Sequence, residues 1–114
     1  MLFRSTAEAW KSLVAEAAQP HAPGAPLEVA VVVELDFYLP RPKSRCRKRD
    51  PEDAIWCTSK PDCDNLAKAL LDCLTQQGWW RDDSQVVRLA IEKRWHGKDG
   101  RPGASVLVWE ASIP

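Results

Sequence analysis

Two carboxylates and a lysine, Asp62, Asp64 and Lys68, stand close together near the middle of the chain. Carboxylates with open coordination positions suit Mg²⁺, a hard cation that prefers oxygen ligands, keeps several waters and binds substrate phosphate. An ion of this kind would polarise a phosphodiester and help to generate hydroxide from bound water. Lys68 would add a fixed cation that stabilises the developing charge or orients the attacking water. These residue types at this spacing predict hydrolysis of a phosphodiester.

A third carboxylate would complete such a site, and the pair Asp82–Asp83 can supply it. In the sequence, the pair follows Asp64 after one helix length and a reversal of the chain. Trp79–Trp80 come just before it and can anchor the turn against a sheet. A chain that leaves the helix and turns back into a strand would bring the pair near the helix start if the strand docks there. We therefore expect one member of the pair to join Asp62 and Asp64.

The residues after Pro61 predict the helix that carries these side chains. A residue before proline avoids helical backbone, and Asp62 or Asp64 can cap the first turn by accepting hydrogen bonds from its free amides. Asp64, Lys68 and Asp72 stand four apart, where ordinary surface ion pairs are an alternative explanation. The acidic pair further along favours a site at the helix start and leaves Asp72 with that structural role. One buried face is predicted for Leu66, Ala69, Leu70, Cys73 and Leu74.

A basic segment precedes the acidic residues, although the 16 basic and 16 acidic residues of the chain cancel. Its cations are expected to hold a nucleic-acid backbone through phosphates, a contact that positions the substrate without reading its sequence. The predicted phosphate contacts are Arg41, Lys43, Arg45, Arg47, Lys48, Arg49 and, just before the acids, Lys60.

The elements predicted from hydrophobic periodicity describe one α+β domain over residues 1–114, with a mixed sheet packed on helices. Ser5 and Glu8 form a possible capping box for the first helix. The basic segment lacks periodicity and is predicted to be a loop. The predicted order is helix, strand, helix, strand, strand, over residues 5–19, 27–39, the helix after Pro61, 85–95 and 104–111.

The composition excludes several other classes of protein. No stretch approaches the roughly 20 apolar residues that cross a bilayer, and the start of the chain lacks an apolar signal region, so we expect a cytoplasmic protein without a membrane partner. The four cysteines include no C-x-x-C pair and are matched by no pair of histidines, which argues against a zinc site. Reduced thiols are expected in the absence of a secretory signal.

The run KPDCDNLAKALLDCL, followed by GWWRDDSQVV, resembles the signature of the RusA family of Holliday junction resolvases, endodeoxyribonucleases of bacteria and their phages. The resemblance covers roughly residues 37–95. It implies a homodimer that uses Mg²⁺ and no small-molecule cofactor, and that resolves four-way DNA junctions by paired symmetric nicks in recombination and repair. By motif position it assigns the metal-binding carboxylates to Asp62, Asp64 and Asp83 and the catalytic lysine to Lys68. Asp82 would support them from outside.

The start of the chain departs from the family pattern. Family members usually begin with a strand and a proline-rich segment, whereas this chain begins almost at the first helix. Without that strand a sheet edge is unpaired and DNA contacts are lost, unless a partner covers the edge. A second possible function is therefore that of a branched-DNA-binding protein derived from such a nuclease, with weak or no activity. A third is a nuclease of the same chemistry acting on other branched DNA or on RNA.

Overall fold

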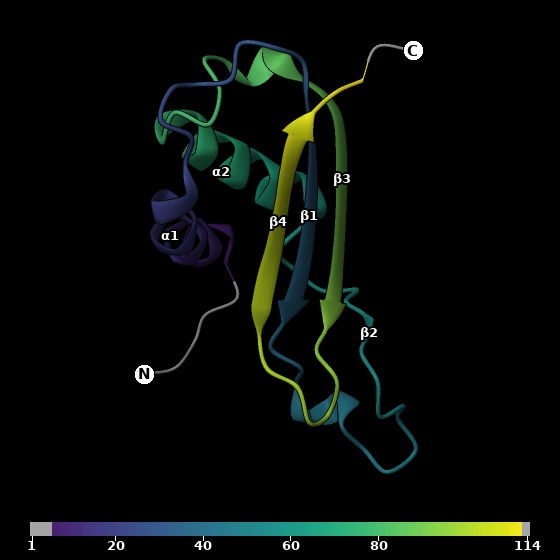
Figure 1. Cartoon of the computed structure of the whole chain (residues 1–114). Coiled ribbons are helices and arrows are strands. Elements are labelled where there is room, and N and C mark those ends of the chain that lie inside the picture. The colour runs from purple at the N-terminus through teal and green to yellow at the C-terminus, as the bar shows by residue number, and fades with distance from the viewer. Residues whose placement is uncertain (1–5, 113–114) are drawn as a thin grey trace.

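The computed structural model describes residues 6–112, which form a four-stranded mixed sheet with two helices packed on one face (Figure 1). This arrangement confirms the predicted α+β class. No helix in the described range has the length and apolar character that crossing a bilayer requires. The elements are α1 (Ala7–Ala18), β1 (Val31–Leu39), β2 (Ile55–Trp56), α2 (Cys63–Gln76), β3 (Val86–Trp95) and β4 (Gly103–Glu110).

The sheet has the strand order β2-β3-β1-β4. β1 runs parallel to β3 and antiparallel to β4, and β2 pairs antiparallel with the end of β3. Parallel neighbours need a long crossover, and the connection from β1 to β3 carries α2. One face of β1 lies entirely in the core, through Val31, Val33, Leu35, Phe37 and Leu39.

The core is closed by the helices on that face. α2 buries the predicted row, with Leu66, Leu70 and Leu74 fully inaccessible. Trp10 of α1 meets Phe37 of β1 edge to face, with 5.3 Å between ring centroids. Burying each large apolar side chain contributes about 1.5–3 kcal/mol, so the helix row fixes α2 firmly against the sheet.

Three details differ from the sequence prediction. β2 was not predicted, because two residues are too few to show an alternating pattern. β1 begins at Val31 and not at residue 27 as predicted, and Val29, which precedes it, is 46% exposed. Thr6 caps α1, with its hydroxyl accepting from the Ala9 amide at 3.1 Å. The predicted cap residue Ser5 lies outside the described residues.

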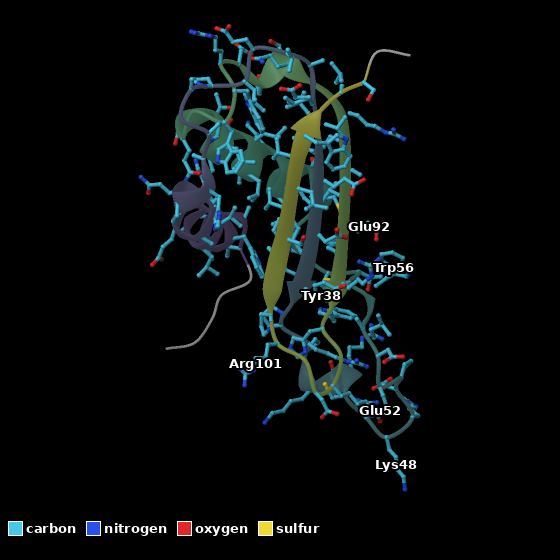
Figure 2. The ribbon with its side chains drawn as sticks, in the orientation of Figure 1. Tyr38, Lys48, Glu52, Trp56, Glu92 and Arg101 are labelled. Carbon is cyan, nitrogen blue, oxygen red and sulfur yellow. The ribbon has the colours of Figure 1, made fainter. Side chains whose placement is uncertain are left out.

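Two connections form a projection beyond the ends of β1 and β3, which we call the distal lobe and define as residues 40–54 and 96–102. Figure 2 shows Lys48 and Glu52 at its far end. Its two parts are tied together, since the Lys98 amide donates to the Glu52 carbonyl at 2.9 Å. The basic segment is therefore an ordered part of the fold.

Candidate functional site

The start of α2 carries two carboxylates, Asp62 and Asp64, that form no ion pair among residues 6–112. Asp62 occupies the predicted cap position, and its carbonyl accepts from the Leu66 amide at 3.0 Å. Its side chain, however, makes no capping hydrogen bond. Among residues 6–112, neither Asp62 nor Asp64 forms an ion pair, and both are exposed. The predicted capping hydrogen bond is therefore wrong, and both carboxylates are open to a cation.

A groove of about 450 Å³ lies between the starts of α1 and α2. Asp62 and Lys68 both line it, as does Lys60 just before the helix. Lys68 pairs with neither Asp64 nor Asp72 within the described part of the chain, so the alternative of a surface ion-pair ladder is not formed. The groove is thus lined by an ammonium and a carboxylate that are both unpaired among residues 6–112.

Two residues on α1 were not predicted to line the groove: Lys11, and Glu8, for which only a capping role was predicted. In the sequence both residues belong to the polar face of an amphipathic helix. They line the groove only because α1 packs on α2. The sequence carries no local signal for this contact.

The acidic turn, which contains Asp82 and Asp83, differs from the start of α2 because one of its carboxylates accepts a hydrogen bond. The Asp82 side chain caps the short 3-10 helix Asp83–Gln85 and accepts from the Ser84 amide at 2.8 Å. This backbone hydrogen bond lowers the pKa of Asp82 below its ordinary value. Asp83 is exposed. Trp80 anchors the turn, since it is buried in the core and its indole donates to the Thr75 hydroxyl of α2 at 2.7 Å, where an anchor against the sheet was expected.

Gln85 holds this turn to the rest of the molecule and was missed in the sequence. Its side-chain oxygen accepts from the amides of Arg81 and Asp82, at 2.9 and 3.0 Å. Its side-chain nitrogen donates to the carbonyls of Leu27 and Val29, both at 2.9 Å. These contacts leave Asp82 and Asp83 with little freedom to move. Glutamine at the third helical position after an aspartate is a capping-box pattern, and that signal was available.

Asp83 does not meet Asp62 within the chain. α2 has 14 residues, and at 1.5 Å per residue such a helix is about 21 Å long. Asp62 stands at its start, whereas the acidic turn shares a depression with Asp72, Thr75 and Gln76 in its last turns. No three Asp, Glu, His or Cys side chains within residues 6–112 are placed to hold one metal ion.

The expected convergence within the chain is therefore wrong. Its physical reason is that the acidic turn Asp82–Asp83, which leads into β3, lies beside Asp72, Thr75 and Gln76 in the last turns of α2 and not beside the start of that helix. The pair at the helix start still fits Mg²⁺, since Asp62 and Asp64 are exposed and free of competing cations in the described range. One or two carboxylates suffice for an ion that keeps waters and binds substrate phosphate.

Arg41 is the second residue whose predicted role changes. It is only 8% exposed. Its guanidinium donates to the carbonyls of Arg45, Pro51 and Asp53, at 2.7, 2.8 and 3.1 Å. An arginine whose donors are mostly taken up by the main chain has little capacity left for a phosphate. Arg41 therefore serves as the internal anchor of the distal lobe, and its burial argues against the predicted phosphate contact.

The other predicted cations lie on the surface. Figure 2 shows Lys48 at the tip of the distal lobe, pointing away from it, and Arg101 on the same lobe. Arg101 comes from the connection between β3 and β4, so the sequence gives no sign that it joins the basic segment. Arg45 lies over the Trp95 ring, 5.3 Å from its centroid. The exposed members of the predicted set are Lys43, Arg45, Arg47, Lys48, Arg49 and Lys60.

Known proteins share this sequence pattern. YqaN, an uncharacterized protein of Bacillus subtilis, is 31% identical over 108 residues, which cover 90% of this chain and 73% of YqaN. The crossover junction endodeoxyribonuclease RusA of Lactococcus phage r1t is 38% identical over 68 residues, 60% of this chain and 44% of the phage protein. The Escherichia coli enzyme of the same name is 50% identical over 40 residues, 35% of this chain and 33% of that enzyme.

The two named nucleases are thus matched over less than half of their own lengths. The family model described as endodeoxyribonuclease RusA, by contrast, matches residues 1–107, nearly the whole chain. The chain belongs to the RusA family of endodeoxyribonucleases.

Proposed function

We propose that this protein is a Mg²⁺-dependent endodeoxyribonuclease that resolves four-way DNA junctions by paired, symmetric hydrolysis of phosphodiesters in recombination and repair. The observation that carries the proposal is the trio Asp62, Asp64 and Lys68, exposed at the start of one helix and unpaired among residues 6–112. Opposite charges four residues apart on a helix ordinarily attract one another. Charges that stay open in this way suit a ligand, and two relatives are crossover junction endodeoxyribonucleases.

Each residue of the trio has a role in this reaction. Asp62 and Asp64 would hold Mg²⁺, which when bound supplies Lewis-acid polarisation of the phosphodiester and activates water. Lys68 lines the groove with Asp62 and would place its ammonium where negative charge builds on the phosphate oxygens. Lys60, at the same groove, would hold a neighbouring phosphate of the bound strand.

A homodimer would supply the third carboxylate. Because Asp83 lies beside the last turns of α2, it is separated from the Asp62 of its own chain by most of the helix length. Two copies related by a twofold axis, with their α2 helices antiparallel, would set Asp83 of the partner subunit beside Asp62 and Asp64. The same operation creates a second, equivalent site. Paired symmetric cuts across a four-way junction require two such sites.

The exposed cations of the distal lobe would hold the arms of the junction by their phosphates. Contacts of this kind supply affinity and orientation without base recognition. Selection of a junction over linear DNA would then depend on the spacing of the two lobes in the dimer. The site of action would be the cytoplasm of a bacterium or of a phage-infected bacterium.

Cleavage of matched substrates tests the proposal. Wild-type protein is incubated with a synthetic four-way junction, a linear duplex and a single strand, each with Mg²⁺ or with EDTA. Cutting of the junction alone, at two symmetric positions and only with Mg²⁺, is the expected result. Equal cutting of the linear duplex would contradict the structure selectivity.

The alternative is a catalytically weak or inactive protein that binds branched DNA. The separation of Asp62 from Asp83 within one protomer favours it if the protein does not dimerise. Tight junction binding without cutting, in Mg²⁺ as in EDTA, is the outcome that would select this alternative.

A further inference from the structure

Lys93 of β3 holds the segment that leads from β2 into α2. Its ammonium donates to the carbonyl oxygens of Ser59 and Pro61, the latter at 2.9 Å. Its own carbonyl accepts from the Cys57 amide at 3.2 Å. One residue of the sheet therefore ties down both ends of the connection that ends at Asp62.

A lysine is unexpected at this position of the strand. Lys93 is in register with Phe37, whose side chain is completely buried, and it falls in the same alternating row as Leu89 and Ile91. It is itself partly buried and forms no ion pair among residues 6–112. Withdrawing an ammonium from water is costly unless hydrogen bonds replace the lost hydration. Backbone carbonyls supply that replacement here, so the charge serves the connection and not a carboxylate.

Asp62 depends on this contact because its own helix holds only its main chain. The carboxylate makes no capping hydrogen bond, and the carbonyl of Asp62 is fixed by the Leu66 amide at 3.0 Å. On the other side, the peptide that joins Pro61 to Asp62 is held through the Pro61 carbonyl, which accepts from Lys93. The orientation of that peptide sets the direction of the Asp62 side chain.

We propose that Lys93 is a positioning residue that sets the carboxylate of Asp62 for binding a divalent cation. It does so by fixing the Pro61–Asp62 peptide and does not itself touch the substrate. The proposal rests on the proposed nuclease function, in which Asp62 is a metal ligand. Residues that orient a metal ligand typically change metal affinity or activity about 10- to 100-fold when they are replaced.

The test measures Mn²⁺ binding to the DNA-free protein by water proton relaxation. Lys93→Met keeps the aliphatic stem and removes the ammonium. We expect it to bind Mn²⁺ about 10- to 100-fold more weakly than wild type, to require correspondingly more Mg²⁺ for cutting, and to bind the junction in EDTA with unchanged affinity.

Lys98→Met is the matched control, because Lys98 also donates to a backbone carbonyl, that of Arg47 at 2.7 Å, but in the distal lobe. Its Mn²⁺ affinity should equal that of wild type, and only its junction affinity should fall. Circular dichroism and thermal unfolding check that each variant folds. If Lys93→Met is unfolded, Lys93→Gln, whose amide is uncharged and one atom shorter in reach, takes its place with the same criteria.

The outcomes separate the two proposals. Wild-type Mn²⁺ affinity in the Lys93 variant overturns the positioning role, whether or not the protein cuts DNA. A wild type that binds Mn²⁺ and cuts no junction overturns the nuclease proposal, while weaker Mn²⁺ binding by the variant still supports the role of Lys93. Failure of wild type to bind Mn²⁺ overturns both.

Discussion

Replacing Asp64 should affect catalysis much more than the stability of the fold. Its side chain is exposed and contacts no cation within residues 6–112, so Asp64→Asn removes a charge and little else. The lost attraction to the helix dipole costs about 0.3–1 kcal/mol of unfolding free energy. We expect Mg²⁺-dependent cutting of a four-way junction to fall at least about 100-fold, with junction binding in EDTA largely retained. Undiminished cutting would remove Asp64 from the site.

The lowered pKa of Asp82 leads to a prediction about pH dependence. The Ser84 amide lowers its pKa, so the folded value lies below the ordinary 3.8. A lowered folded pKa stabilises the protein above the unfolded pKa, and this contribution is lost as the pH falls through the folded pKa. The Ser84 amide proton shift should therefore titrate with a midpoint below 3.8. In Asp82→Asn that titration should be absent, and its persistence there would assign the shift to another carboxyl.

The distal lobe shows how one element uses arginine in two ways. Arg41 is buried and donates to backbone carbonyls, whereas Arg49 is exposed at the surface. Arg41→Met should lower the unfolding free energy by about 2–3 kcal/mol in urea denaturation, because buried carbonyls lose a charged donor. Arg49→Met, the matched control, should change it by less than about 0.5 kcal/mol.

Affinity for DNA should respond to Arg49 in its own right. Loss of one phosphate contact makes the slope of log affinity against log salt shallower by about 0.9. A salt slope in Arg49→Met identical to that of wild type would show that this side of the lobe does not meet phosphate.

The same contrast explains how far the sequence could predict these elements. α2 follows from a strong local period, and Asp62 and Lys68 come with it because they are one or two turns apart. The role of Arg41 depends on carbonyls brought to it by folding, and its amide hydrogen bonds to His96, 55 positions away. Lys93 left one trace in the sequence, a charged residue in an otherwise apolar row of a strand.

At the scale of the whole molecule, the separation of Asp62 and Asp83 is set by where β3 docks. Whether Asp83 lies near Asp62 depends on where β3 docks relative to α2. Local sequence patterns do not predict that position. The carboxylate types were therefore predictable, and their assembly within one protomer was not. In the proposed dimer each site takes Asp62 and Asp64 from one copy and Asp83 from the other.

Mixing two inactive variants tests this sharing. In a heterodimer of Asp64→Asn and Asp83→Asn, one shared site carries both lesions and the other carries none. With random pairing of equal amounts, about half of the dimers are heterodimers with one intact site, so nicking should return to about a quarter of the wild-type level. The products should be nicked junctions, because a single site cannot make paired cuts.

A mixture of Asp62→Asn and Asp64→Asn is the control, since both lesions fall on the same half of each site and no exchange of subunits restores it. If this control mixture recovered cutting, the Asp62 and Asp64 variants would not each have lost activity through the loss of a metal ligand. If the Asp64 and Asp83 variants fail to complement although subunit exchange is shown by mass spectrometry, the proposed sharing of each site between two chains is wrong.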